Sequence, residues 1–121
     1  MVYDITINTE DGYLHVIVKG TASLDGNIDL QMKVVKACTK EKLNRAIVDI
    51  RDLKNPTSIT EVYQFGKESE RNLRNILIKA AVLHNIDRTE HESFLETTMR
   101  NRGVNLKSFV KKKDALEWLL E

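Results

Sequence analysis

Apolar residues along this chain alternate between two spacings, one typical of strands and the other typical of helices. From Val2 to Val18, apolar and polar residues alternate around the turn signal Glu10-Asp11-Gly12, which predicts a β-hairpin. From Leu24 to Cys38 the apolar residues follow helical spacing, and Ser23 or Asp25 is placed to cap the start of this helix. The chain therefore begins with two strands and a helix.

Three further strands and three further helices follow in alternation. Residues 45–51 and 76–84 are short apolar runs typical of strands covered on both faces, and residues 104–110 alternate as a third strand. The capping-box patterns Ser58-Ile-Thr-Glu61 and Thr89-Glu-His-Glu92 mark two helix starts, and a short helix over residues 115–120 closes the chain. In the first of these helices we expect four residues to face inward, namely Ile59, Val62, Tyr63 and Gly66.

The expected order is β-β-α-β-α-β-α-β-α, an α/β sandwich with an N-terminal hairpin and then mainly parallel strands with packed helices. A chain of 121 residues has room for one domain, over residues 1–121. Cys38 is the only cysteine, so an internal disulfide is excluded and a reducing, cytoplasmic location is expected. The sequence shows no export signal and no membrane span.

The balance of charge argues against a polyanionic partner. The formal net charge is +1 and only 6% of residues are aromatic, so we expect no nucleic-acid binding. The charges are nevertheless unevenly spread, because residues 1–30 hold five acids and one base whereas residues 31–45 hold five bases and one acid. We interpret the basic segment as a solvated helix end whose cations complement the helix dipole.

Two segments carry a resemblance to a known family. The strand and polar loop Ala46-Ile-Val-Asp-Ile-Arg-Asp-Leu53 resemble the STAS fold of sulfate transporters and anti-sigma-factor antagonists. The tail from Glu96 to Phe109, followed by Asp114-Ala-Leu-Glu-Trp-Leu119, is similar to the closing signature of the SpoIIAA-like branch, also described as STAS/SEC14-like. The resemblance spans nearly the whole chain and implies a domain that binds rather than transforms.

The resemblance carries two functional implications. Antagonists of this family are phosphorylated on a serine at the start of the helix after this strand, and Thr57 or Ser58 occupies the equivalent neighbourhood here, without the family's tandem serine-glycine pattern. The SEC14-like label implies related domains that hold lipids or other apolar ligands between helices and sheet. A lipid carrier would need an apolar cavity of roughly 300 Å³ or more.

Candidate binding residues gather where parallel strands end. Ligands of open α/β sheets usually lie beyond the carboxyl ends of the strands, so we expect a pocket rim built from Arg51, Asp52, His84, Asp87 and Arg88. The two arginines would bind a phosphate or carboxylate, and His84 would donate a hydrogen bond or act as a base. The alternative interpretation is an ordinary polar loop edge.

Other chemistries lack a complete set of residues. Asp49, inside an apolar strand, is expected to bond neighbouring backbone amides. His91 and Glu92 lack the second histidine of a zincin, so no metal site is expected and helix capping is the simpler role. Cys38 lies on a helix stripe that should be buried, and no glycine-rich phosphate loop follows a strand, so neither a cysteine nucleophile nor a cofactor is expected.

The leading hypothesis is a non-enzymatic STAS-like domain that binds a protein partner or a small anionic or apolar ligand, with a regulatory role. A lipid carrier or sensor is the first alternative. The second is a small hydrolase-like enzyme that uses His84, Asp52 and Asp87 in a cleft at the strand ends. An apolar face on the last helix would support a weak homodimer.

Overall fold

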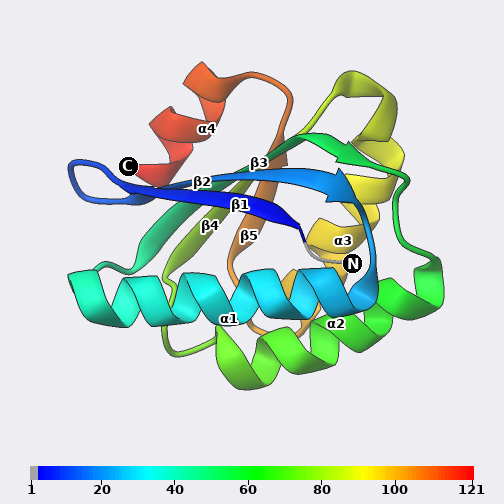
Figure 1. Ribbon diagram of the computed structural model, residues 1–121, viewed down its shortest axis with the longest axis horizontal. Coiled ribbons are helices and arrows are strands. Elements are labelled where there is room, and N and C mark those ends of the chain that lie inside the picture. Colours follow the sequence, from blue (N-terminus) through cyan, green and yellow to red (C-terminus); the bar gives the residue numbers. More distant parts are fainter. Residues whose placement is uncertain (1–2) are drawn as a thin grey trace.

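A five-stranded sheet forms the centre of the computed structural model, which describes residues 3–121 (Figure 1). Val2, expected in the first strand, lies outside the described residues. The strand order is β1-β2-β3-β4-β5; β1 runs antiparallel to β2, and the other neighbours are parallel. The strands are β1 (Asp4–Thr9), β2 (Leu14–Thr21), β3 (Arg45–Lys54), β4 (Lys79–Leu83) and β5 (Leu106–Phe109).

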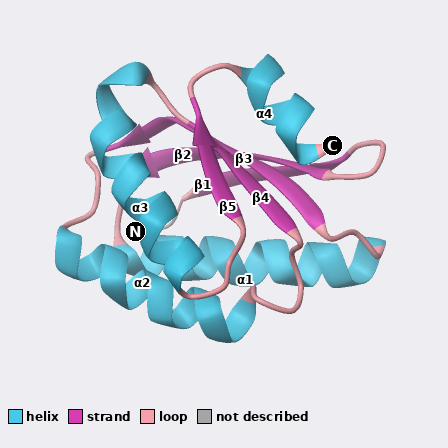
Figure 2. Cartoon of the chain, turned by 180° about the vertical axis from the view of Figure 1, so that it is seen from behind, coloured by secondary structure: helices cyan, strands magenta, loops and turns pink. Residues whose placement is uncertain are grey.

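Four helices connect or follow these strands in the expected order, which confirms the predicted α/β sandwich. They are α1 (Leu24–Glu41), α2 (Ile59–Asn72), α3 (Thr89–Asn101) and α4 (Lys112–Leu119), and a 3-10 turn, η1 (Ile86–Arg88), precedes α3. Figures 1 and 2 show α1, α2 and α3 on one face of the sheet and α4 on the opposite face. None of these helices, within the part of the chain that the structure describes, is both long and apolar enough to cross a membrane.

The sheet divides the core into two unequal clusters. The larger cluster lies between the sheet and the layer of three helices, and it includes Val16, Val34, Val82 and Met99. The smaller cluster lies under α4, where Ala115 and Leu119 pack on Ile47 and Ala81. The single cysteine, Cys38, is buried in the larger cluster, and burial raises the pKa of its thiol to about 11, as expected of a packing residue.

The buried face of helix α2 differs from the face that its residue spacing predicts. Val62 and Gly66 are buried as expected, but Ile59 is 64% exposed and Tyr63 is 50% exposed, so their predicted inward orientation is wrong. A Cβ atom at Gly66 would lie 3.0 Å from Thr98 Cγ2, so this glycine permits close approach to α3 rather than to the sheet. Because α2 packs against both α1 and α3, its buried stripe consists of Val62, Gly66 and Ser69 and leaves Ile59 and Tyr63 outside.

Strand β4 is shorter than its apolar run. The expected strand began at residue 76, whereas the structure begins β4 at Lys79. The backbone amides of Ile76 and Leu77 instead donate to Leu73 O, both at 3.0 Å, so these residues continue the turn that follows α2. Leu77 is buried in that turn, which explains the apolar sequence without a strand.

Candidate functional site

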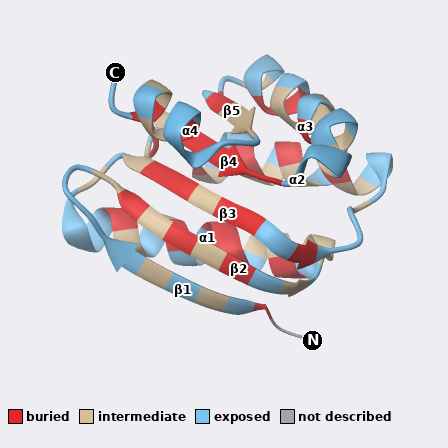
Figure 3. Ribbon diagram, turned by 90° about the horizontal axis from the view of Figure 1, so that it is seen from above, coloured by how far each residue is buried: buried red, intermediate tan, exposed pale blue. Residues whose placement is uncertain are grey.

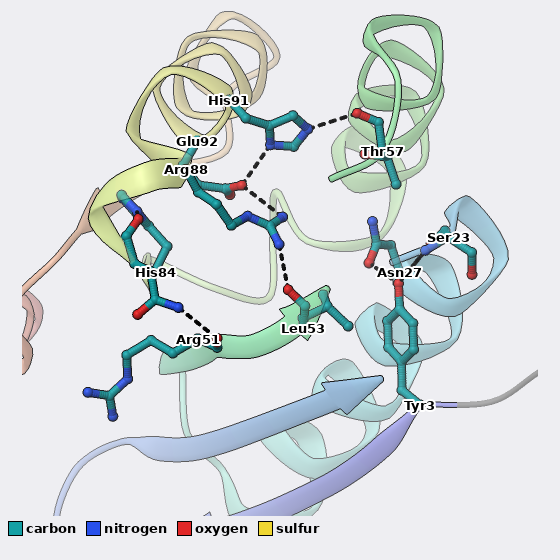
Figure 4. Close-up of polar contacts among 11 residues, drawn as sticks. Tyr3, Ser23, Asn27, Arg51, Leu53, Thr57, His84, Arg88, His91 and Glu92 are labelled. Atoms are coloured by element: carbon teal, nitrogen blue, oxygen red, sulfur yellow. Dashed lines mark hydrogen bonds and ion pairs between the residues drawn. The ribbon is translucent and has the colours of Figure 1, made fainter. Parts of the chain in front are cut away.

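The candidate site lies at the edge of the sheet where the parallel strands end and the three layered helices begin (Figure 4). In a sheet with helical crossovers, each strand reaches this edge before the chain turns into the next helix. Ser23 caps α1 here through a hydrogen bond from Gly26 N to its Oγ, and Ser58 caps α2. The edge therefore gathers polar side chains and helix N-termini from segments far apart in sequence.

A chain of hydrogen bonds crosses this edge from β3 to the β3–α2 connection through the start of α3 (Figure 4). Arg88 Nη1 donates to Leu53 O at 2.6 Å, and Arg88 Nη2 donates to Glu92 Oε2 at 3.2 Å. The same carboxylate oxygen lies 2.6 Å from His91 Nδ1, and His91 Nε2 lies 3.0 Å from Thr57 O. We call Arg88, His91 and Glu92 the ionic cluster. It joins the end of β3 and the β3–α2 connection to α3.

The ionic cluster is largely withdrawn from water. Glu92 is 1% exposed and the Arg88 side chain is 11% exposed, so each charge depends on the other for compensation. Arg88 Nε is buried and has no hydrogen-bond partner among the described residues. Since buried donors are normally satisfied, this nitrogen is a position where a bound water or ligand oxygen would be stabilised.

His91 is held in a setting that favours its protonated form. Both ring nitrogens face acceptors, the carboxylate of Glu92 and the carbonyl of Thr57, and only an imidazolium can donate to both. The hydrogen bond with Glu92 raises the pKa of His91, against the opposing effect of burial. The protonated form of His91 is therefore favoured in the cluster, and neither ring nitrogen is left without an acceptor.

A narrow apolar cavity of about 100 Å³ lies between the sheet and the helix layer. Side chains of α1, β3, α2, β4 and α3 line it, including Leu30, Val48, Phe65, Ala80 and Met99. The lining also includes the ionic cluster, Asn27 and Thr57, which lie near the carboxyl edge (Figure 4). The structure thus combines an apolar interior with polar groups at one end, the usual composition of a small-molecule site.

Of the five residues expected to form one pocket rim, one lines the cavity and the other four do not. Arg88 lines the cavity, as described above. The Arg51 side chain lies on the opposite face of the sheet. It donates two hydrogen bonds to the Asp49 carboxylate, from Nε to Oδ1 at 3.0 Å and from Nη2 to Oδ2 at 2.7 Å. Asp52 and Asp87 are exposed, and neither is among the cavity-lining residues.

His84 is buried but is not paired with a carboxylate. It is 2% exposed, and its Nδ1 lies 2.8 Å from Asn85 O. The Asn85 side chain donates to Arg51 O at 2.8 Å and so ties the end of β4 to the end of β3 (Figure 4). His84 and its neighbour therefore brace the strand ends.

Asp49 has the structural role predicted for it. Its Oδ1 accepts a bond from the backbone amide of Arg51 at 3.1 Å, in addition to the two guanidinium bonds. Burial opposes ionisation of this carboxyl group, but the hydrogen bonds from Arg51 outweigh burial and lower its pKa. A charged pair inside an apolar strand is thereby stabilised.

Of the two candidate phosphate acceptors, Ser58 is exposed and Thr57 is half-buried. Ser58 forms a complete capping box with Glu61, because Glu61 N donates to Ser58 Oγ and Ser58 N donates to Glu61 Oε1. The predicted second capping box, Thr89 with Glu92, is wrong, as is the capping role expected of His91 and Glu92. Thr89 Oγ1 donates to Ile86 O, and Glu92 turns inward to the ionic cluster.

Tyr3 is a residue of this edge that the sequence did not single out. Its hydroxyl accepts a bond from Ser23 N at 2.7 Å and donates to Asn27 Oδ1 at 2.7 Å (Figure 4). A Cβ atom on Gly26 would overlap the Tyr3 ring, so the glycine makes room for it at the start of α1. The only sequence signal was a glycine in the first turn of a helix.

No three His, Cys, Asp or Glu side chains in residues 3–121 are grouped as ligands of a metal ion. His84, Asp87, His91 and Glu92, which are close in sequence, have different partners or face solvent. His84 bonds a backbone carbonyl, and His91 and Glu92 bond each other.

Comparison with known proteins identifies similar solved structures. No protein-family model matches the sequence, and no curated protein matches it. The structure is similar to that of an anti-sigma factor antagonist from Mycobacterium paratuberculosis, with a TM-score of 0.65 and 15% identity over 98% of this chain and 95% of the other. It is also similar to an uncharacterised protein with a SpoIIAA-like fold from Shewanella loihica, with a TM-score of 0.62 and 20% identity over 97% and 93% of the two chains. The chain therefore has the SpoIIAA-like, or STAS, fold that its sequence resemblance predicts.

Proposed function

We propose that this protein is a non-enzymatic regulatory domain that acts by binding a protein partner at the carboxyl edge of its sheet. The fold it shares with an anti-sigma factor antagonist supports a regulatory role. The location that best suits the buried, unpaired Cys38 is the cytoplasm, and the whole of residues 1–121 acts as one domain.

The observation that carries this proposal is an exposed apolar surface beside the start of α2. Ile59 is 64% exposed and Tyr63 is 50% exposed, and the Tyr63 ring packs edge-on against Phe94 of α3 with ring centroids 5.5 Å apart. We call these three residues the α2–α3 patch. Large apolar side chains grouped on a surface are typical of protein contact sites, and aromatic residues contribute strongly there.

Phosphorylation of Ser58 would regulate this patch. The residue precedes Ile59 directly, and its hydroxyl is exposed. A phosphate would be stabilised by the N-terminus of α2 but would repel the carboxylate of Glu61, which now completes the capping box. Thr57, also in the neighbourhood that the family uses, is less accessible because it lines the cavity.

The test is quantitative affinity capture from cells of the source organism, followed by binding measurements with the purified partner. The wild-type protein is compared with the double variant Ile59→Lys and Tyr63→Lys. The matched control is Ile78→Lys with Val110→Lys, since these side chains are 49% and 40% exposed and lie outside the patch. We expect one protein to bind wild type and control but not the patch variant. Equal binding to all three baits would refute the docking face.

The phosphate hypothesis has its own measurement. Intact-mass and peptide mapping of the protein purified from its source should show one phosphate on Ser58, and phosphorylated protein should bind the captured partner differently from the unmodified form. A partner that binds both forms equally would reject the switch while leaving the docking face intact.

The cavity favours a second candidate function, the binding of a small apolar molecule. At about 100 Å³ it is smaller than the roughly 300 Å³ at which ligand pockets usually begin, so a lipid chain would require the helices to move away from the sheet. A molecule of benzene's size matches it better, because apolar cavities of about 150 Å³ are known to bind benzene. The unsatisfied Arg88 Nε would add one hydrogen bond for a ligand oxygen.

The placement of the histidines supports binding over catalysis. The enzyme alternative needs His84 beside Asp52 or Asp87, whereas His84 bonds a backbone carbonyl and both aspartates face solvent. His91 has a carboxylate neighbour, but both of its ring nitrogens are occupied by acceptors. A general base needs a free nitrogen within reach of a substrate proton.

A further inference from the structure

Strand β1 forms an outer edge of the sheet, and within residues 3–121 its free side lacks the usual protection (Figure 3). Its sequence, Asp4-Ile-Thr-Ile-Asn-Thr9, has no proline and no lysine, the residues that commonly block strand edges. Its pairing with β2 is regular over all six residues, without a bulge. Such a strand is able to accept a further strand.

The pairing pattern shows which backbone groups are free. Glu10 N donates to Tyr13 O, so these two residues form a hydrogen-bonded pair next to the end of the ladder. Hydrogen-bonded and non-bonded pairs alternate along an antiparallel ladder, so the backbones of Asp4, Thr6 and Asn8 bond β2. The amide and carbonyl groups of Ile5, Ile7 and Thr9 therefore point to the open edge.

A basic groove runs beside this edge. It has a volume of about 590 Å³ and lies between β1 and α1. Its apolar surface comes from Tyr3, Ile5, Ile7 and Ala37, and its charged residues are Asp4, Lys33, Lys36 and Lys40. Lys33 is paired with Asp29 at 3.0 Å, whereas no ion pair within residues 3–121 involves Lys36 or Lys40. The uneven charge seen in the sequence is thus concentrated along a free strand edge.

We propose that an acidic, extended peptide segment of a partner protein binds here by adding a strand to β1. The backbone of the segment would bond the free groups of Ile5, Ile7 and Thr9, and alternate side chains would point towards α1. Acidic residues at those alternate positions would meet Lys36 and Lys40. This surface is separate from the α2–α3 patch, so the inference does not depend on the proposed function.

The strand edge and its lysines favour an acidic peptide over two other occupants, a second copy of the chain and a nucleic acid. A second copy of the chain, pairing β1 with β1 about a two-fold axis, would bring the lysines of both α1 helices together, and the repulsion would disfavour the dimer. A nucleic acid would meet the lysines but would leave the backbone groups of the strand edge without partners.

The experiment uses an acetylated, amidated nine-residue peptide of alternating glutamate and valine, titrated into the isotopically labelled full chain. NMR shifts give the affinity, and amide hydrogen exchange identifies the bonded groups. We expect the amides of Ile5, Ile7 and Thr9 to gain protection. Methylating the peptide's backbone nitrogens on one set of alternate residues should abolish binding, whereas methylating the other set should not, because only one set faces β1.

Charge-reversal variants test whether binding depends on the lysines of the groove or on surface charge in general. The double variant Lys36→Glu and Lys40→Glu should lose about tenfold in affinity, because two surface attractions become repulsions. The matched control, Lys111→Glu with Lys112→Glu, carries the same change in charge on exposed residues at the start of α4 and should bind as wild type does.

Any of the following results would overturn the proposal. The first is the absence of binding at millimolar peptide, and the second is protection of amides outside β1. The third is equal loss of affinity in both double variants. The fourth is tighter binding of a nine-nucleotide single-stranded DNA at the same lysines, or a dimer in sedimentation that the peptide does not dissociate.

Discussion

At the scale of single residues, contacts between distant positions define the carboxyl edge. Tyr3 and Gly26 are 23 positions apart, yet the ring of one occupies the space where the other would carry a Cβ atom. The hydroxyl of Tyr3 also satisfies Ser23 N at the start of α1. No local sequence pattern predicts this contact, because the two residues come close only when α1 packs on the sheet.

Replacing Gly26 with alanine should destabilise the protein by about 1–3 kcal/mol, because the added methyl group overlaps the Tyr3 ring. This loss is expected despite the gain of about 1 kcal/mol that alanine normally gives in a helix. Urea unfolding measures the difference. Gly66→Ala is the comparison, with the same gain in helix propensity but with side-chain ends of Thr98 and Arg102 as neighbours, and it should cost less. A Gly26→Ala protein more stable than wild type would contradict the close packing.

The stability contributed by His91 should depend on pH with a defined sign. Its pKa is raised in the folded protein, chiefly by the bond with Glu92, so its contribution is complete below the unfolded value of about 6.5. The contribution is lost as pH rises through the folded pKa. We therefore expect the difference in unfolding free energy between wild type and His91→Gln to shrink from pH 6 to pH 9.

An NMR titration of the His91 ring provides the direct check. Its pKa should lie above that of an unfolded peptide and should fall in Glu92→Gln, which removes the negative charge but retains an oxygen acceptor. An unchanged His91 pKa in this variant would show that Glu92 is not the cause.

At the scale of elements, two similar sequence patterns have different outcomes. Ser58 and Glu61 form the capping box that their spacing predicts. Thr89 and Glu92 have the same spacing, but Glu92 leaves the helix start to bind Arg88 and His91. Arg88 and His91 lie within four residues of Glu92, so these cations are local, but the burial of the carboxylate that favours pairing with them over capping is a tertiary effect. The order of strands and helices was predictable because hydrophobic periodicity is a local property.

Ser58→Ala should destabilise the protein by about 1 kcal/mol through loss of the α2 cap. The same variant should expose the amide of Glu61 to faster hydrogen exchange, because that amide loses its acceptor. Thr60→Ala, at an exposed position in the same turn that makes no cap, should change stability by less than about 0.5 kcal/mol. Equal effects of the two substitutions would mean that the serine hydroxyl does not stabilise the helix.

At the scale of the whole molecule, the unequal helix layers decide where the cavity forms. Three helices cover one face of the sheet and enclose the small cavity, whereas α4 alone packs on the other face. Arg51, placed by sequence in the same rim as Arg88, turns to the opposite side and pairs with Asp49. Residues at the ends of neighbouring strands share an edge, but a sheet has two faces, and the strand ends alone do not say which face a side chain joins.

Benzene should raise the melting temperature of the wild-type protein by several degrees at saturation, if the cavity binds small apolar molecules. Ala80→Val places two more methyl groups in the cavity, so it should stabilise the free protein by up to about 1.5 kcal/mol and remove the benzene effect. Thr6→Val, on exposed β1, controls for the strand preference of valine. A benzene shift that persists in Ala80→Val would place the ligand elsewhere.

The sequence by itself determined the order of elements, the cap of α2, the inert burial of Cys38 and the role of Asp49, because each depends on residues within about one helical turn or on one strand. The tertiary structure decided which apolar residues of α2 remain exposed, which of the rim arginines lines the cavity, and that Glu92 joins an ionic cluster. It also placed the lysines of α1 along the free edge of β1. These outcomes depend on which layers meet. Even for Glu92, whose cation partners Arg88 and His91 lie within four residues, burial between the layers decided that it pairs with them and does not cap α3.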